Sequence, residues 1–176
     1  GRDLRWFINK LAGELDWDFL QQVFPPIGEG LWRMHQEGVV HLDVKPANVL
    51  LRTSGQPLLL DFGAAQTMDN DNRFGSFQTL THGFAPPEQY LDGNLGPWTD
   101  IYGLAATIYN CITGHSPPPA LKRRDGASLE KLTVSRSGAY PYTLLKVVED
   151  ALSLDQGQRP HDMHAFLSLA FGASSH

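Results

Sequence analysis

One stretch, from Gly38 to Gly63, constrains the fold of this chain more than any other. It reads GVVHLDVKPANVLLRTSGQPLLLDFG, with short apolar runs at 39–40, 49–51 and 58–60. Short β-type runs, the last two separated by a cluster of Thr, Ser, Gly, Gln and Pro, predict strand, loop, strand, hairpin turn and strand. A frame of this kind holds its polar residues at the ends of short strands.

The polar residues in this frame have the chemistry of a magnesium and phosphate site. Asp43 and Asn48 fall in the first loop, and Asp61 ends the last strand. Carboxylate and amide oxygens are hard donors that suit a Mg²⁺ ion which also binds substrate phosphates. Lys45 adds a positive charge beside them. The alternative interpretation is a solvated turn between two strands that binds nothing.

These residues resemble the catalytic loop of protein kinases. HLDVKPAN at 41–48 matches H-R-D-L-x-x-x-N at every key place except the Arg, and DFG at 61–63 matches D-F-G at the usual distance. AA at 64–65 and FAPPEQY at 84–90 are similar to bacterial Ser/Thr protein kinases. The resemblance covers essentially all 176 residues, but only the C-terminal lobe of the kinase fold.

The resemblance implies a role for each matched residue. Asp43 would accept or orient the proton of the substrate hydroxyl, and Lys45 would contact the transferred γ-phosphate of ATP. Asn48 and Asp61 would hold Mg²⁺, and Leu50 would pack under the adenine. A Lys two residues after the catalytic Asp favours Ser or Thr as the acceptor, so the implied partner is a protein substrate.

Other matched residues are expected to shape the site. His41 and Phe62 would align the two loops by packing, without acid-base chemistry. Asp100, in DIYGL, would hold the backbone of the catalytic loop, and Arg159 would pair with Glu88 as a long-range clamp. Two roles fit Asp3, a bond to the ATP ribose or an ordinary helix N-cap.

The segment between Gly63 and Pro86 is rich in Asn, Asp, Ser, Thr and Gly, and it reads as a long surface loop. In the kinase resemblance it is the activation segment. Thr81 matches the Thr that sits beside the catalytic Asp and Lys. Thr79 and Ser76 are candidate phosphorylation sites, and solvated loop hydroxyls are the alternative.

The rest of the chain predicts a mainly α fold. It is expected to be a single domain, 1–176, in which a helical bundle carries a short β-hairpin with the catalytic and D-F-G loops. Apolar spacing predicts a helix at 17–37 that Pro25-Pro26 interrupt and bend, and a helix at 101–113 that is apolar on nearly all sides and therefore central. A further apolar face spans 144–152, and a last helix is expected to start at Pro160. Segment 121–137 reads as loop with a short helix.

Two departures from the kinase pattern matter. Leu42 replaces the Arg that pairs with a phosphate on the activation loop, so the chain resembles kinases that loop phosphorylation does not switch on. Nothing in the sequence matches a Gly-rich phosphate loop, the strand Lys of V-A-I-K, or its helix Glu. The N-terminal, ATP-covering lobe is therefore expected to be absent, and this chain alone is expected to have little or no kinase activity.

Three functions remain open from sequence. The chain is the catalytic lobe of a Ser/Thr kinase, a pseudokinase-like docking or regulatory module without ATP turnover, or part of a small-molecule kinase. The joint presence of Asp43, Lys45, Asn48 and Asp61 favours the first over the second. Thr81, Glu88 and Arg159, which look like peptide-substrate architecture, disfavour the third.

Composition limits the partners. A formal net charge of -5 gives no basic footprint for nucleic acid. The single cysteine, Cys111, excludes an internal disulfide and fits a reducing cytoplasm. No apolar run has the length of a membrane span, so this segment is expected to make no membrane contact.

His161 and His164 have a spacing that suits metal, but a solvated helix face is the favoured interpretation.

Overall fold

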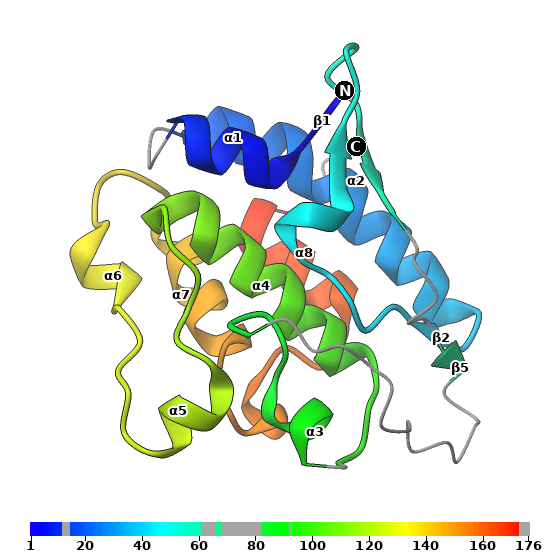
Figure 1. Cartoon of the computed structure of the whole chain (residues 1–176), viewed down its shortest axis with the longest axis vertical. Coiled ribbons are helices and arrows are strands. Elements are labelled where there is room, and N and C mark those ends of the chain that lie inside the picture. The colour runs from blue at the N-terminus through cyan, green and yellow to red at the C-terminus, as the bar shows by residue number, and fades with distance from the viewer. Residues whose placement is uncertain (12–14, 61–65, 68–81, 92, 173–176) are drawn as a thin grey trace.

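The computed structural model describes residues 1–11, 15–60, 66–67, 82–91 and 93–172. Helices form most of this part of the chain and a small antiparallel sheet lies at one end (Figure 1), as the sequence predicts. The elements are β1 (Arg2–Asp3), α1 (Leu4–Leu11), α2 (Trp17–Gln36), β2 (Val39–Val40), the 3-10 turn η1 (Pro46–Asn48), β3 (Val49–Leu51), β4 (Pro57–Leu59), β5 (Gln66–Thr67), α3 (Pro87–Tyr90), α4 (Pro97–Thr113), α5 (Ala120–Arg124), α6 (Leu132–Ser135), α7 (Tyr142–Ala151), the 3-10 turn η2 (Gln156–Gln158) and α8 (Met163–Phe171).

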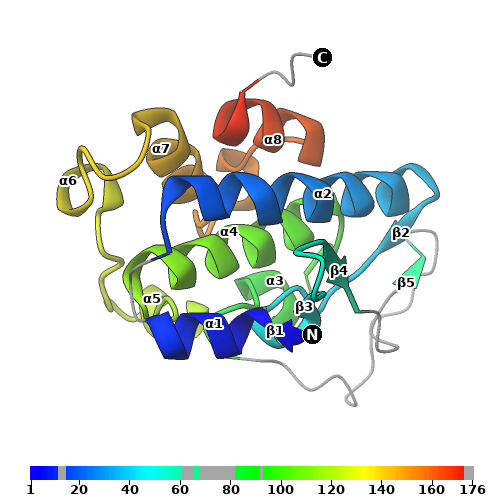
Figure 2. The same cartoon turned by 90° about the horizontal axis from the view of Figure 1, so that it is seen from above.

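Helix α4 is the centre of the domain. Pro97 begins it, Gly114 ends it in a left-handed conformation with φ 85°, and nearly every residue from Thr99 to Ile112 is buried. It packs on α2 and α7, and Figure 2 shows it between α1 and the α7–α8 pair. The predicted central helix is therefore confirmed, and it supplies a rigid base for the loops that lie against it.

Helix α2 is uninterrupted, which corrects one prediction. Its N-cap, Asp16, accepts a hydrogen bond of 2.9 Å from the backbone N–H of Phe19. Pro25 and Pro26 lie inside the helix without ending it. Each proline removes a backbone donor, but residues before and after the pair, such as Phe24 and Ile27, are buried in one core and hold both halves in register.

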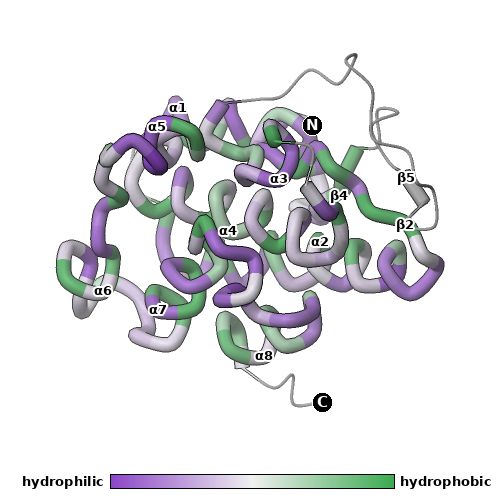
Figure 3. Tube along the Cα trace, turned by 90° about the horizontal axis from the view of Figure 1, so that it is seen from below, coloured by the Kyte–Doolittle hydropathy of each residue, from purple (hydrophilic) through white to green (hydrophobic). Residues whose placement is uncertain are grey.

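The predicted order of strand, loop, strand, hairpin and strand is confirmed. Strand β3 pairs with β4 in antiparallel fashion, and β1 adds to the other side of β3. Val49 and Leu51 point into the core, whereas Leu50 between them is half-buried on the opposite face, as strand alternation requires. Strand β2, hydrophobic at both residues (Figure 3), pairs with β5.

The C-terminal part follows the predicted helices with shifted boundaries. Helix α7 covers the predicted apolar face, and α8 begins at Met163 and not at Pro160. Its true cap is Asp162, whose carboxylate accepts from the N–H of Ala165 at 2.7 Å. Segment 121–137 contains most of α5 and all of α6, two short helices where one was predicted. Among the described residues, no helix combines the length and hydrophobicity needed to cross a bilayer.

Candidate active site

Residues 41–48 form a loop that is fixed at both ends. It begins after β2 and closes through η1 into β3. Leu42 has a positive φ of 68°, which is strained for a residue with a Cβ. Its backbone N–H donates to Oδ1 of Asp100 at 2.8 Å, and its carbonyl accepts from Nε2 of Gln89 at 3.1 Å. These bonds from two other helices hold the strained turn in place.

Three of the predicted catalytic residues lie together in this loop. Nδ2 of Asn48 donates to the backbone carbonyl of Asp43 at 2.8 Å and to its Oδ2 at 3.0 Å. Nζ of Lys45 lies 3.5 Å from Oδ1 of the same carboxylate. The side chains of Asp43 and Lys45 are 20% and 23% exposed, so a substrate can reach them from solvent.

The two bonds of Asn48 also orient its amide. Both acceptors belong to Asp43 and neither can donate, so the nitrogen must face them and the amide oxygen must point away from Asp43. Asn48 is buried, and an oxygen fixed in this manner is a suitable ligand for a hard cation such as Mg²⁺. The donor type and its orientation therefore fit the predicted metal role.

His41 uses both ring nitrogens within the site. Nε2 lies 2.8 Å from the carbonyl oxygen of Leu60, and Nδ1 accepts the N–H of Asp43 at 3.1 Å. A carbonyl only accepts and an N–H only donates, so this pattern places the ring proton on Nε2. The ring connects the loop to Leu60, the residue that follows β4, and such a contact fits an aligning role.

Asp100, at the start of α4, accepts hydrogen bonds from the backbone of the loop. Its Oδ2 accepts the N–H of His41 at 2.8 Å and its Oδ1 accepts that of Leu42 at the same distance. The predicted contact between Asp100 and the loop backbone is therefore present. Nε2 of His35 also lies 2.8 Å from Oδ2, and both side chains are buried.

Sequence reasoning missed His35. The residue lies four positions after Leu31 and eight after Ile27, on the buried face of α2. This spacing was the available signal, because a polar residue in an apolar stripe needs a buried partner. Gln89 was also missed, although it directly contacts the loop.

Gly103 allows α4 to approach the loop. A Cβ built at this position would lie 3.1 Å from both Cβ and the carbonyl oxygen of Val44. That spacing is tighter than ordinary van der Waals contact, and one of the two atoms belongs to the backbone. The helix and the residue after Asp43 are therefore in direct contact.

Several predicted residues lie outside the described part of the chain. These are Asp61, Phe62, Thr79 and Thr81, together with the candidate phosphorylation site Ser76. The last described residue before them is Leu60, whose N–H donates to the carbonyl of Asn48 at 2.7 Å. The chain thus leaves the described site directly beside Asn48.

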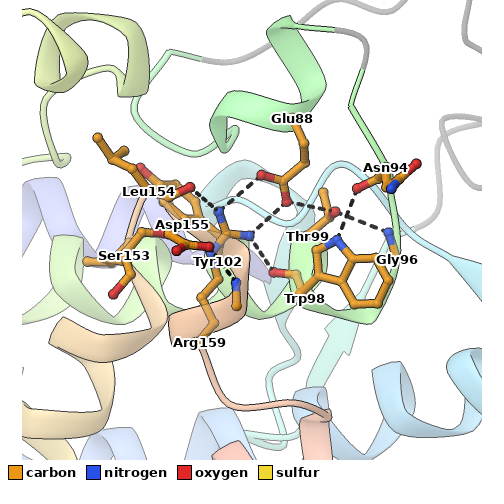
Figure 4. A network of polar contacts seen from close by, with 12 residues as sticks. Glu88, Asn94, Gly96, Trp98, Thr99, Tyr102, Ser153, Leu154, Asp155 and Arg159 are labelled. Carbon is orange, nitrogen blue, oxygen red and sulfur yellow. Dashed lines mark hydrogen bonds and ion pairs between the residues drawn. The ribbon is translucent and has the colours of Figure 1, made fainter.

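A buried ion pair fixes helix α3 near the loop (Figure 4). Arg159 donates from Nη1 to Oε2 of Glu88 at 2.7 Å and from Nη2 to Oε1 at 3.0 Å, which is a bidentate contact. Its remaining donors reach the backbone carbonyls of Trp98, Ser153 and Leu154. The predicted contact between Arg159 and Glu88, 71 residues apart, is present.

Asp3 and Leu50 occupy the sheet beside the loop. Oδ1 of Asp3 accepts the N–H of Trp6 at 2.9 Å, so Asp3 forms the N-terminal cap of α1, one of its two expected roles. Leu50 pairs with Asp3 across β1 and β3 and with Leu58 across β3 and β4. The two leucines share the face of the sheet that is turned from the core.

His164 lies in α8, and His161 lies just before the helix. No group of three or more His, Cys, Asp or Glu in the described ranges is arranged to hold a metal ion. The ring of His164 stacks on Trp32 with centroids 4.9 Å apart, and His161 is exposed beside Asp162.

Comparison with known proteins agrees with this geometry. The sequence model of the protein kinase domain matches residues 3–168. The chain is 36% identical over 96 residues to the serine/threonine-protein kinase PknL of Mycobacterium tuberculosis, covering 54% of this chain and 24% of that protein. It is 31% identical over 163 residues to PknK of the same organism, covering 84% and 14% respectively. The chain thus spans a quarter or less of these relatives.

A solved structure described as PpkA-294 apo form is also similar. Its TM-score against this chain is 0.82 at 32% sequence identity, and the match covers 97% of this chain and 60% of that one. The arrangement of helices and sheet is therefore shared over almost the whole of this chain.

Proposed function

We propose, because this chain belongs to the protein kinase domain family, that it forms the large catalytic lobe of a Ser/Thr kinase. The reaction is transfer of the ATP γ-phosphate to Ser or Thr hydroxyls of a protein substrate. The observation that carries the proposal is the convergence of Asn48 and Lys45 on the carboxylate of Asp43. Mycobacterial relatives named as Ser/Thr kinases support the same reaction class.

Asp43 is the residue that meets the acceptor hydroxyl in this proposal. One carboxylate oxygen accepts from Asn48 and the other lies near Lys45, so the side chain is held in one orientation. Phosphoryl transfer depends mainly on positioning and on stabilisation of spread negative charge. Asp43 orients the hydroxyl and accepts its proton, while the ammonium group of Lys45 stabilises the charge on the transferred phosphoryl group.

Asn48 and Asp61 are the proposed Mg²⁺ ligands. The orientation of the Asn48 amide supports this role, and Asp61 follows directly after Leu60, which is bonded to both Asn48 and His41. Bound Mg²⁺ would neutralise phosphate charge as the bond to the leaving group breaks. The described part of the chain contributes the oriented amide oxygen of Asn48 and the strained loop that positions it.

The outer face of the small sheet is the proposed contact with ATP and with an N-terminal lobe. Leu58 is 36% exposed and lies beside half-buried Leu50 on this face. An apolar surface of this kind suits the adenine ring, and the cap at Asp3 lies next to it. The sequence of this chain contains no Gly-rich phosphate loop, so we expect the 176-residue chain alone to be inactive.

The test is a phosphoryl-transfer assay with the longer protein that contains this chain. Labelled ATP and dephosphorylated casein serve as substrates, and Asp43→Asn is expected to reduce kcat by about 100-fold or more. Asn48→Ala is expected to raise the Mg²⁺ concentration needed for half-maximal rate. Lys146→Gln changes an exposed cation remote from the loop and is the matched control.

Two results would overturn the proposal. If Asp43→Asn retains the rate of the unmodified protein, Asp43 has no catalytic role. If the unmodified protein is folded and transfers no phosphate in the presence of Mg²⁺, the lobe is a docking or regulatory module.

A further inference from the structure

A groove lies where β1, α1, α2 and the β3–β4 hairpin meet. Figure 1 shows these elements beside one another. Its volume is about 430 Å³, within the range of ligand-binding clefts. We call it the basic groove. Its lining residues are Gly1, Arg2, Phe7, Phe19, Gln22, Val23, Leu51, Arg52, Thr53 and Gly55, and none of the proposed catalytic residues is among them.

The floor of the basic groove is apolar. Phe7 of α1 and Phe19 of α2 lie with ring centroids 6.0 Å apart at an angle of 42°, and Leu51 of β3 completes this surface. These residues come from separate elements that also pack on the core, so the groove is built on a fixed scaffold. An apolar floor of this size favours a ligand that has an apolar side chain to bury.

The rim of the basic groove carries cations. Arg2 in β1 pairs with Leu51 in β3, and Arg52 follows Leu51 directly, so both arginines line the groove beside this strand pair. Among the described residues, neither guanidinium forms an ion pair, although the whole chain has a net charge of -5. The guanidinium carbon of Arg2 lies 4.9 Å from the ring centroid of Trp6, a cation–π contact that orients this side chain.

We propose that the basic groove docks an acidic peptide segment of a partner protein. An apolar side chain of that segment fills the floor between Phe7 and Phe19. Adjacent carboxylates pair with the guanidinium groups of Arg2 and Arg52. Charge complementarity at the rim supports this docking, which does not depend on the proposed kinase reaction.

The net charge of the molecule helps to distinguish specific binding of an acidic peptide from unspecific electrostatic attraction. A chain with a net charge of -5 attracts cationic peptides in general. Preference for an acidic peptide must therefore come from a local basic site. Two fluorescein-labelled peptides serve as probes, Glu-Glu-Leu-Phe-Glu-Glu and the same sequence with every Glu replaced by Lys.

Binding is measured by fluorescence polarisation at low salt, first with this chain and then with the longer protein. We expect the acidic peptide to bind more tightly, and Arg52→Glu to weaken it by about tenfold, because attraction becomes repulsion. Lys122→Glu makes the same charge change on α5, which does not line the groove, and is expected to leave affinity within about twofold.

A second variant tests the apolar floor without disturbing the core. Gln22 lines the groove from the exposed side of α2, so Gln22→Trp is expected to fill the cavity and reduce affinity while circular dichroism stays unchanged. If Arg52→Glu fails to fold, Gln22→Trp still tests whether the peptide binds in the groove. The combination of both effects identifies the groove as the binding surface.

Three outcomes would overturn the proposal. The first is stronger binding of the lysine peptide, and the second is no binding of the acidic peptide at millimolar concentration. The third is a dimer of this chain in analytical ultracentrifugation that Arg52→Glu dissociates, because the groove would then be covered by a second copy. None of these results bears on phosphate transfer, which the Asp43→Asn assay tests separately.

Discussion

Nε2 of His35 lies 2.8 Å from Oδ2 of Asp100, in the interior between α2 and α4. Asp100 also accepts the backbone N–H groups of His41 and Leu42, so the imidazole orients the carboxylate that holds the candidate catalytic loop. Both side chains are almost fully buried. A change in this pair is therefore expected to act on the loop without touching a substrate.

The first prediction concerns Asp100→Asn. The two carboxylate oxygens of Asp100 accept hydrogen bonds from two different backbone N–H groups. The amide of an Asn at this position would turn its own NH₂ group toward one of these donors. We expect the free energy of unfolding to fall by about 3 kcal/mol, since a buried donor is left unpaired. His35→Phe removes one hydrogen bond and keeps both loop contacts, so its expected loss is smaller, about 1 kcal/mol.

Urea unfolding followed by circular dichroism checks both values. Equal losses in the two variants would contradict this account, because they would assign the stabilisation to the imidazole and not to the loop contacts.

The second prediction concerns the buried pair of Arg159 and Glu88. Arg159 has no exposed side-chain surface, and Glu88 has 6%. Arg159→Met is expected to lower the free energy of unfolding by about 3–5 kcal/mol, because it leaves a buried carboxylate without its partner. The double variant with Glu88→Gln should lose less than the sum of the single changes.

Lys146→Ala is the matched control for this pair. Lys146 and Asp150 form an exposed ion pair at 3.0 Å, and such pairs contribute less than about 1 kcal/mol. A similar loss for Lys146→Ala and Arg159→Met would show that burial does not set the strength of the contact.

The sequence allowed much of this arrangement to be predicted because its signals are local or carried by motifs. The short apolar runs around 39–60 predicted the strands, and the apolar character of 101–113 predicted the central helix. The contacts of Asp100 and Arg159 followed from the kinase resemblance, since spacing alone does not show which residues meet over long distances.

Other features depended on tertiary packing and were not visible in the sequence. The continuity of α2 through Pro25 and Pro26 is decided by the buried face on both sides of the pair. The positive φ of Leu42 is stabilised by contacts from Asp100 and Gln89, which come from other helices. Local propensity predicts neither result, because in both cases distant residues outweigh it.

The third prediction is that Gly103→Ala displaces the candidate catalytic loop. The new methyl group would press against the carbonyl oxygen and Cβ of Val44 at 3.1 Å. We expect a modest loss of stability, about 1 kcal/mol, and a larger effect on kcat of the longer protein, about tenfold, because Val44 follows Asp43 directly. Gly30→Ala is the control, since a Cβ there meets no atom within 4 Å.

Steady-state phosphate transfer and urea unfolding are measured on the same preparations. An unchanged kcat for Gly103→Ala would show that the loop tolerates a shift of α4.

The last prediction uses the single cysteine as a probe of the core. Cys111 lies in α4 with no exposed surface, and burial raises the pKa of its thiol well above the ordinary value. We expect no alkylation of the native chain by iodoacetamide at pH 8, and complete single alkylation in guanidinium, both followed by intact mass. Rapid modification of the native chain would contradict the burial of this thiol.

The same pKa difference predicts how stability depends on pH. The fold favours the neutral thiol, so its contribution is fully present below the thiol pKa of the unfolded chain, about 8.5. Above that pH the unfolded chain loses the proton first, and the free energy of unfolding should fall by about 1.4 kcal/mol per pH unit. Cys111→Ala removes this dependence while keeping the buried tyrosines, whose raised pKa values act only above about pH 10. Parallel stability curves for the two proteins between pH 8 and 10 would therefore show that the thiolate is tolerated in the core.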